Sequence, residues 1–139
     1  MERLHYQPIN QFRVKSGSCE ITDAWSLAKV TASSPAIEVM TDLRRIPAAT
    51  IAHGVSLSET NHSMILRGVR LLFVEDASRR IVGIVTSNDL LGEKPTRVAR
   101  ERMMRHEELT VRDIMVATEE LDAVSLTDVL RSEVGHVVA

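Results

Sequence analysis

The residues best suited to chemistry are a threonine and an aspartate three positions apart, Thr86 and Asp89. They follow the apolar run 81–85, where a buried strand is expected to become a helix. A carboxylate at such a point can accept hydrogen bonds from both hydroxyls of a ribose. The threonine hydroxyl and the free N–H groups at the helix start can meet a phosphate. The spacing therefore favours binding of a ribose phosphate over bond-breaking chemistry.

The same pair also fits a purely structural role. Thr86 is a good N-cap and Asp89 stands at the third helical position, so the two would cap the helix without any ligand. The spacing alone leaves both interpretations open. In the binding interpretation, Ile84 and its aliphatic neighbours supply a flat apolar wall for a purine base.

Other chemistry is poorly represented. No two of the five histidines stand four positions apart, and Cys19 is the single cysteine, so we expect neither a metal site nor an internal disulfide. The sequence has no nucleophile elbow and no phosphate loop of the Gly-x4-Gly-Lys type. We therefore expect a protein that is not an enzyme and carries no cofactor of its own.

Composition narrows the class of protein further. The 139 residues are 44% hydrophobic and 3% aromatic, which predicts an aliphatic core and no stacking platform for single-stranded nucleic acid. The net charge of -2 predicts no strong attraction to nucleic acid or to an anionic membrane. No apolar run approaches the ~18 residues of a bilayer span. With one cysteine, these features predict a cytoplasmic protein that binds neither nucleic acid nor membrane.

Helix-breaking residues and helix-capping residues predict the elements that position Thr86. Residues 1–33 are expected to be an irregular lead-in, and a short helix over 34–43 would begin with Ser34 as N-cap and Pro35 at the first helical position. The expected elements that follow are a strand at 49–51, a helix over 57–67 with a Ser56/Glu59 capping box and Gly68 at its end, a hairpin of 69–74 with 81–85, and a short helix over 87–91. Because both hairpin runs are continuously apolar, their strands are expected to be buried on both faces or nearly so.

A charged stretch, 96–109, is expected to form a linker helix. It holds four arginines within nine residues, which raises a polyphosphate-binding hypothesis for Arg97 or Arg100. Three glutamates stand in the same stretch at helical spacings, so mutual ion pairing on a solvated helix is the favoured interpretation.

The pattern of the first half returns in the second. Residues 111–115 echo 36–40, 75 positions apart, with an apolar–acidic–apolar order that ends in methionine. Residues 124–128 echo 55–59, 69 positions apart, including the serine cap and the acid three positions later. Two matches in the same order indicate an internal repeat. The second copy reaches Ala139 before its own hairpin, so either the natural protein is longer or another chain completes the second half. We favour a longer natural protein or a shortened form of one.

These features resemble the CBS modules, which are named after cystathionine beta-synthase. The second strand of the hairpin matches the family pattern Gly-apolar-apolar-Thr-x-x-Asp over Gly83–Asp89. The apolar–methionine element of the family stands twice, at Val39-Met40 and at Ile114-Met115. The loop Gly92–Pro95 is similar to that of the small stand-alone CBS pairs of bacteria.

The resemblance implies an α+β fold of tandem CBS modules, each with a short strand, a helix, a β-hairpin and a helix. It covers residues 34–92 completely and 110–139 partially, and it does not cover 1–33. It divides the chain into a first module at 34–95, a linker helix at 96–109 and a truncated second module at 110–139. Modules of this family pack sheet to sheet about a pseudo-twofold axis, and the missing second hairpin puts one of the two expected clefts in question.

The resemblance also implies an adenosine-containing ligand between the modules: AMP, ADP, ATP or S-adenosylmethionine. The segments after each methionine, 41–47 and 116–121, are the expected floor and lid of the clefts. The expected ligand contacts are Ile84, Thr86, Asp89 and Val116.

The function predicted on these grounds is regulatory sensing, in which a ligand between two half-modules shifts their relative angle. The alternative is a protein-interaction or dimerisation scaffold without a small-molecule ligand. The family commonly dimerises through its helices, so a homodimer is expected. Four side chains are expected in the core, or else at that interface: Met40, Leu43, Met64 and Ile65.

Overall fold

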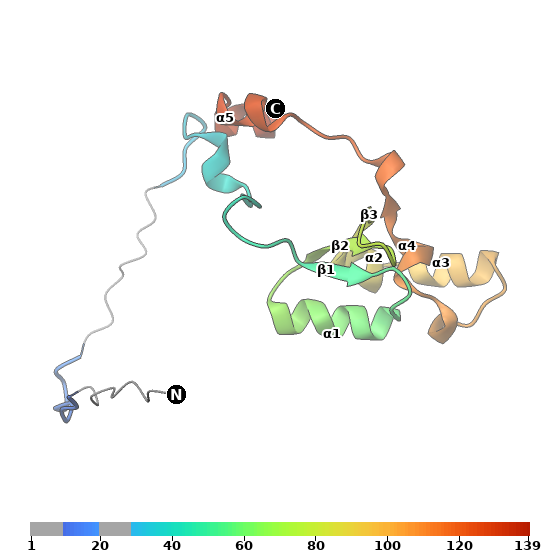
Figure 1. Ribbon diagram of the computed structural model, residues 1–139, viewed down its shortest axis with the longest axis horizontal. Helices are drawn as coiled ribbons and strands as arrows, with labels where there is room; N and C mark the ends of the chain where they lie inside the picture. The colour runs from blue at the N-terminus through green and yellow to red at the C-terminus, as the bar shows by residue number, and fades with distance from the viewer. Residues whose placement is uncertain (1–9, 20–28) are drawn as a thin grey trace, which may run out of the picture.

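The structure is a computed structural model that describes residues 10–19 and 29–139 (Figure 1). Its elements, with 3-10 helices written η, are η1 (Ala36–Val39), β1 (Thr50–Ala52), α1 (Leu57–Arg67), β2 (Leu71–Glu75), β3 (Ile81–Thr86), α2 (Ser87–Leu91), α3 (Lys94–Glu101), η2 (His106–Glu108), α4 (Val111–Ile114), β4 (Val116–Ala117), η3 (Thr118–Glu120), α5 (Leu126–Leu130) and α6 (Val134–Val138). Most of the predicted lead-in, 1–33, lies outside the described residues. Within the described ranges, no helix combines the length and the hydropathy that crossing a membrane requires.

The four strands form one mixed sheet in the order β1-β2-β3-β4. Strand β1 runs parallel to β2, and α1 makes the connection between them. The hairpin of β2 and β3 is antiparallel, and the two-residue strand β4 extends the sheet on the far side of β3. We call β1–β4 together with α1–α4 the sheet unit.

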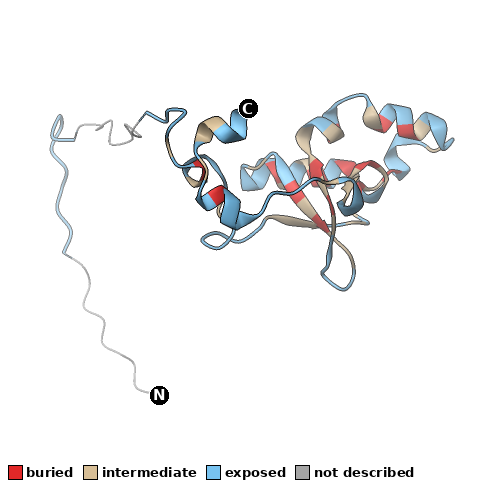
Figure 2. Cartoon of the chain, turned by 90° about the horizontal axis from the view of Figure 1, so that it is seen from above, coloured by how far each residue is buried: buried red, intermediate tan, exposed pale blue. Residues whose placement is uncertain are grey.

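One face of this sheet carries the core. The fully buried Leu72, Val74 and Val85 lie on that face, against helix residues that include Met64 and Ile114. Figure 2 shows most of the buried residues gathered in the sheet unit. Residues on the opposite face are only half-buried or exposed, so the prediction of strands buried on both faces is wrong. The buried helix residues therefore pack against a single face of the sheet.

Local signals set the ends of the first two helices as predicted. The Ser56 hydroxyl accepts a hydrogen bond from the Glu59 N–H at the start of α1. At the other end, Gly68 has a φ of 64°, and the N–H groups of Gly68 and Val69 return to the Ile65 and Met64 carbonyls. This is the left-handed helix ending that glycine favours. The hydroxyl of Thr86 caps α2, whose bounds are those expected from the sequence.

The short helix expected over 34–43 is reduced to the four residues of η1. Pro35, not Ser34, is the N-cap residue, and no side chain caps this turn. The Ala36 N–H donates instead to the Ser132 carbonyl, at 2.9 Å. A distant segment therefore satisfies the donor that a local cap would have satisfied.

The predicted linker helix is interrupted. Helix α3 ends at Glu101, and Met103 takes a left-handed φ of 51°. The N–H of Met104 returns to the Ala99 carbonyl, which is the same helix ending that Gly68 provides for α1. Only η2 follows, so one continuous helix over 96–109 is wrong.

The ion pairing expected in this stretch is found in part. Arg105 pairs with Glu108 at 3.1 Å, as the spacing predicts. The backbone N–H of Arg105, and then its guanidinium, hold the pKa of Glu108 below its ordinary value. Arg102 pairs outside the stretch, with Asp113 of α4. Arg97 and Arg100 have no ionic partner among the described residues.

The two ends of the described chain pair with each other. Residues 31–40 lie beside α5 and α6, away from the sheet unit (Figure 1). Pro35 and Glu133 form an antiparallel bridge, and the Val134 N–H donates to the Ser34 carbonyl at 2.8 Å. We call η1, α5 and α6 the terminal unit. Its buried apolar residues are Ala36 and Val129.

This pairing bears on the internal repeat. In the sheet unit, Thr110 bridges Ser56, and the Val111 N–H donates to the Val55 carbonyl. In the terminal unit, Pro35 bridges Glu133, and the Ala36 N–H donates to Ser132. The echo of 36–40 in 111–115 is therefore matched by a shared backbone pairing.

The second echo holds only in part. Helix α5 does begin after Ser125, but the Ser125 side chain makes no cap hydrogen bond. The residue that occupies the bridging place of Ser56 is Glu133, eight positions after Ser125. The sequence echo at 124–128 therefore predicts the helix start but not the pairing.

Of the four side chains expected in the core, one is buried and three are exposed. Met64 is buried, as preferred. Met40, Leu43 and Ile65 are exposed, with 69% of Ile65 accessible, so a core position for these three is wrong. Helix α1 turns Ile65 away from the sheet, and Met40 and Leu43 lie in the segment between η1 and β1.

Candidate functional site

Thr86 and Asp89 meet in a complete capping box. The Asp89 Oδ2 atom accepts from both the N–H and the hydroxyl of Thr86, each at 2.8 Å. The Thr86 hydroxyl in turn accepts from the Asp89 N–H at 3.3 Å. The structural interpretation of the pair is thus present in the geometry, with no ligand required to hold it.

One carboxylate oxygen of Asp89 remains for other contacts. Its Oδ1 atom lies 3.5 Å from the Lys94 Nζ atom, a distance typical of a loose ion pair. The Asp89 side chain is 18% exposed, so this oxygen is close to solvent. Lys94 opens α3 from the loop Gly92–Pro95 and places a cation beside the box.

The register of the sheet aligns the other proposed residues on one face. Thr86 is the direct partner of Leu71, and Ile84 is the direct partner of Phe73. Val116 of β4 pairs with Ile84 from the other side. Because direct partners project to the same face, these side chains form a continuous strip on the face that the helices leave open.

Next to this strip lies an apolar cleft of about 560 Å³. One wall is the segment after the first methionine, with Thr41, Leu43, Ile46 and Pro47. The opposite wall is the start of the hairpin, from Val69 to Phe73. The segment 41–47 therefore lines a cleft, as expected, but Thr86 and Asp89 do not line this one. Leu71 and Phe73 belong both to the wall of the cleft and to the strip. The cleft is therefore continuous with the strip that carries Thr86, Ile84 and Val116.

Arg70 stands at the hairpin side of this cleft, and the sequence analysis did not identify it. Its Nε atom donates to the Ser87 hydroxyl at 3.3 Å, and its carbonyl accepts from the Ser87 N–H at 2.9 Å. No carboxylate among the described residues pairs with it. The available signal was a lone arginine that opens an apolar strand, two residues after the Gly68 helix ending.

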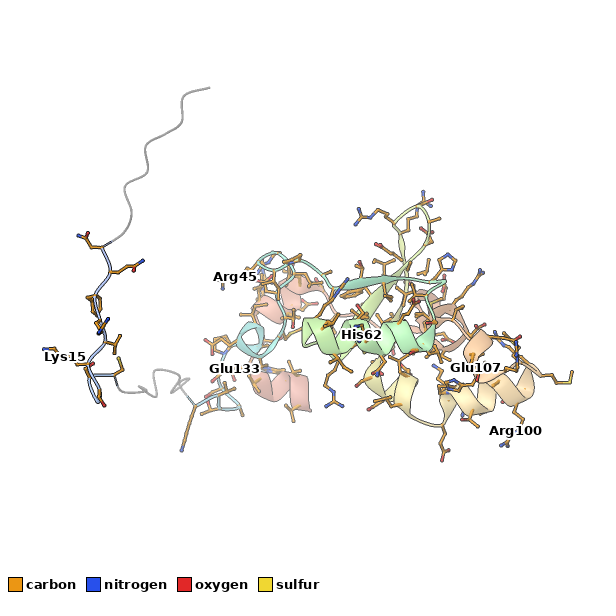
Figure 3. The ribbon with its side chains drawn as sticks, turned by 90° about the horizontal axis from the view of Figure 1, so that it is seen from below. Lys15, Arg45, His62, Arg100, Glu107 and Glu133 are labelled. Atoms are coloured by element: carbon orange, nitrogen blue, oxygen red, sulfur yellow. The ribbon has the colours of Figure 1, made fainter. Side chains whose placement is uncertain are left out.

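In the segment 41–47 on the other side of the cleft, two charged side chains pair with each other and do not line the cleft. Arg44 donates to Asp42 through two nitrogens, at 3.0 Å each. These hydrogen bonds hold the pKa of Asp42 below its ordinary value and raise the pKa of Arg44. Arg45 and Glu133 lie in this region, whereas Arg100 and Glu107 lie at the α3–η2 end of the molecule (Figure 3). Among the residues that line the cleft, Arg70 is the one cation, and no carboxylate of the described residues pairs with it.

Comparison with known proteins gives structural matches. No family model and no curated protein matches the sequence. An uncharacterised conserved protein from Pyrococcus horikoshii superposes with a TM-score of 0.54 at 18% identity, over 78% of this chain and 70% of that one. The chain has the CBS-pair fold.

Solved structures that are named as CBS-domain or CBS-pair proteins align over less of the chain. A CBS-domain protein from Agrobacterium tumefaciens aligns over 53% of each chain at 21% identity, with a TM-score of 0.41. The CBS-pair protein CBSX2 of Arabidopsis thaliana aligns over 63% of this chain and 62% of that one, at 20% identity and a TM-score of 0.42. A structure of CBSX2 in complex with AMP aligns over 53% and 54%, at 19% identity and a TM-score of 0.42. This chain thus spans about half the length of the Agrobacterium protein.

The CBS-pair fold predicted from Gly83–Asp89 and the two methionine elements is confirmed. Residues 121–139 form α5 and α6 and no strand, and the division into modules stays a prediction. At these identities the likeness concerns the fold. The ligand, the contact residues and the homodimer stay predictions.

Proposed function

We propose that this chain is a regulatory CBS-type module that binds an adenine nucleotide or a related adenosyl compound in the cleft between residues 41–47 and β2. The observation that carries the proposal is an apolar cleft of about 560 Å³ with an unpaired arginine, Arg70, at its hairpin side. Such a site suits a ligand with a flat apolar part and an anionic part. AMP is the simplest adenosyl ligand of this kind, and CBSX2 has been crystallised with it.

In the proposed complex the base lies against the apolar strip. Leu71 and Phe73 provide the cleft wall, and Ile84 and Val116 continue it across β3 and β4. The ribose faces Thr86 and Asp89, where Asp89 Oδ1 accepts from a ribose hydroxyl. Arg70 binds the phosphate through a charge-assisted hydrogen bond, and Ser87 fixes the arginine in place.

The regulatory part of the proposal follows from the position of the cleft. Segment 41–47 leaves η1 of the terminal unit and leads to β1 of the sheet unit. A ligand that contacts both this segment and β2 therefore favours one arrangement of the two units over others. The differential contact is what a ligand needs in order to shift a conformational equilibrium.

Thermal unfolding with ligands tests the proposal. AMP at 100 times its dissociation constant adds about 2.7 kcal/mol to the folded state, which is several degrees for a chain of this size. The shift should be confined to adenosyl compounds. It should fall in the variants Arg70→Gln and Asp89→Ala, and persist in the matched control Arg100→Gln on α3. A shift of equal size in all four proteins would place the ligand elsewhere.

The complete capping box favours a second candidate. Because Thr86 and Asp89 satisfy each other without a ligand, the chain can act as a protein-interaction or dimerisation scaffold. This function predicts no shift with any adenosyl compound. It also predicts that Asp89→Ala costs a cap-sized ~0.5–2 kcal/mol and changes no ligand response.

A further inference from the structure

A second cleft, of about 320 Å³, lies at the other end of the hairpin. It borders the β2–β3 turn and the β4–η3 segment, whereas the first cleft borders the start of β2. Its lining combines two nitrogen donors, His53 and Arg112, with two carboxylates, Asp76 and Glu119. Val82 and Met115 add an apolar part. None of these residues lines the cleft of the proposed function.

Backbone hydrogen bonds fix the walls of this second cleft. The His53 N–H donates to the Glu75 carbonyl, and the His53 carbonyl accepts from the Arg112 N–H, both at 3.0 Å. The Thr118 hydroxyl donates to the Ile81 carbonyl at 3.4 Å and ties the β4–η3 segment to the hairpin. The four polar side chains therefore project from backbone that the sheet unit holds in place.

The opposite charges of the cleft do not meet. Among the described residues, the side chains of His53, Arg112 and Glu119 make neither an ion pair nor a hydrogen bond. Asp76 Oδ1 accepts from the N–H groups of Ser78 and Arg80, whereas its Oδ2 accepts from no described residue. Elsewhere in this chain neighbouring opposite charges do pair, as Arg44 does with Asp42 at 3.0 Å. The second cleft thus keeps donors and acceptors apart across a space of molecular size.

We propose that this cleft binds a free α-amino acid with a small apolar side chain. Arg112 and His53 donate to the α-carboxylate, and Asp76 Oδ2 and Glu119 accept from the α-ammonium group. The side chain of the ligand packs on Val82 and Met115. A zwitterion satisfies both halves of the cleft at once, which a simple anion or cation does not.

Isothermal titration with three probes tests this site: L-valine, N-acetyl-L-valine and L-valine methyl ester. The first has both charges, the second lacks the ammonium, and the third lacks the carboxylate. We expect binding of L-valine and at least about tenfold weaker binding of either derivative, because each loses charge-assisted hydrogen bonds. Equal binding of N-acetyl-L-valine would show an anion site, equal binding of the ester a cation site, and no binding of L-valine an empty surface. Each of these outcomes overturns the proposal.

Two variants locate the site. Arg112→Gln and Glu119→Gln each remove one charge from an exposed side chain, and each should weaken L-valine binding about tenfold or more. Arg100→Gln and Glu101→Gln on α3 are the matched controls and should bind as the parent does. Unfolding curves of all four should coincide with the parent curve, which separates lost binding from lost folding. Equal losses in variants and controls would contradict the assignment.

Discussion

The sheet unit and the terminal unit use the same backbone device with different packing behind it. Thr110 bridges Ser56 in the first, and Pro35 bridges Glu133 in the second. Behind the first bridge lies a continuous core with Leu72, Val85 and Ile114, whereas the second has Ala36 and Val129. Backbone pairing brings the segments together in both units, and the burial of apolar side chains determines how stable each pairing is.

Apolar side chains also remain partly exposed in and beside the terminal unit. Leu130 is 49% exposed and Leu43 is 47% exposed, and both belong to or adjoin the terminal unit. The proposed ligand cleft lies between the sheet unit and the segment 41–47, which leads to the less well packed terminal unit. This position suits a site where ligand binding changes the arrangement of the two units.

The largest expected effect breaks the core of the sheet unit. Ile114→Ala should lower the free energy of unfolding by about 2–5 kcal/mol, because Ile114 is fully buried and leaves a cavity. Leu130→Ala in the terminal unit should cost about 0.5 kcal/mol or less. Urea unfolding of both variants measures the contrast, and equal losses would mean that the two units are equally well packed.

The attachment of β4 depends on a single glycine. A Cβ atom at Gly83 would lie 2.5 Å from the Val116 carbonyl oxygen and 2.9 Å from the Met115 Sδ atom. Gly83→Ala should therefore push β4 off the sheet and cost about 1–3 kcal/mol. The control Gly54→Ala meets no atom within 4 Å. Hydrogen exchange should show faster exchange of the Val116 and Ala117 amides in Gly83→Ala alone.

The two serine and threonine caps should respond differently. Thr86→Ala removes a cap hydrogen bond and should cost about 0.5–2 kcal/mol. Ser125→Ala removes a side chain that makes no cap hydrogen bond, and its cost should stay near zero. If denaturation gave similar costs for both, Ser125 would stabilise its helix start as Thr86 does. That result would contradict the absence of a cap hydrogen bond at Ser125.

The smallest expected effect is the dependence of stability on acidic pH through the Asp42–Arg44 pair. The hydrogen bonds from Arg44 lower the pKa of Asp42 in the folded state, so the contribution of this pair is present above the unfolded pKa and is lost as the pH falls through the folded one. The Arg44 side chain is 54% exposed, so solvent screens the pair and the effect on stability is small. An NMR titration should place the midpoint of Asp42 below the usual aspartate value, and Arg44→Gln should return it. An unchanged midpoint in that variant would contradict the pairing.

Local signals in the sequence predict most of the sheet unit. Gly68, Ser56 and Thr86 fix helix ends through contacts within a few residues, so spacing is enough to place them. The end of α3 at Met103 was missed because a methionine carries no sign of a left-handed φ. The shortened η1 was missed because its partner, Ser132, stands far along the chain.

The candidate site shows the same limit. Thr86 and Asp89 are recognisable as a pair because they are three positions apart. Arg70 becomes noticeable only when the fold places it beside Ser87 and at the cleft of residues 41–47. Spacing in the sequence does not reveal a cation that acts across a hairpin.

The central claim is that the cleft between residues 41–47 and β2 is the ligand site. An NMR titration of the ¹⁵N-labelled chain with AMP tests it most directly. The account predicts saturable shifts in the amides of 41–46, of 69–73 and of Thr86, with smaller shifts in the terminal unit and little change at the control segment 96–101. Saturable shifts confined to other residues, or no shift at millimolar AMP, would contradict it.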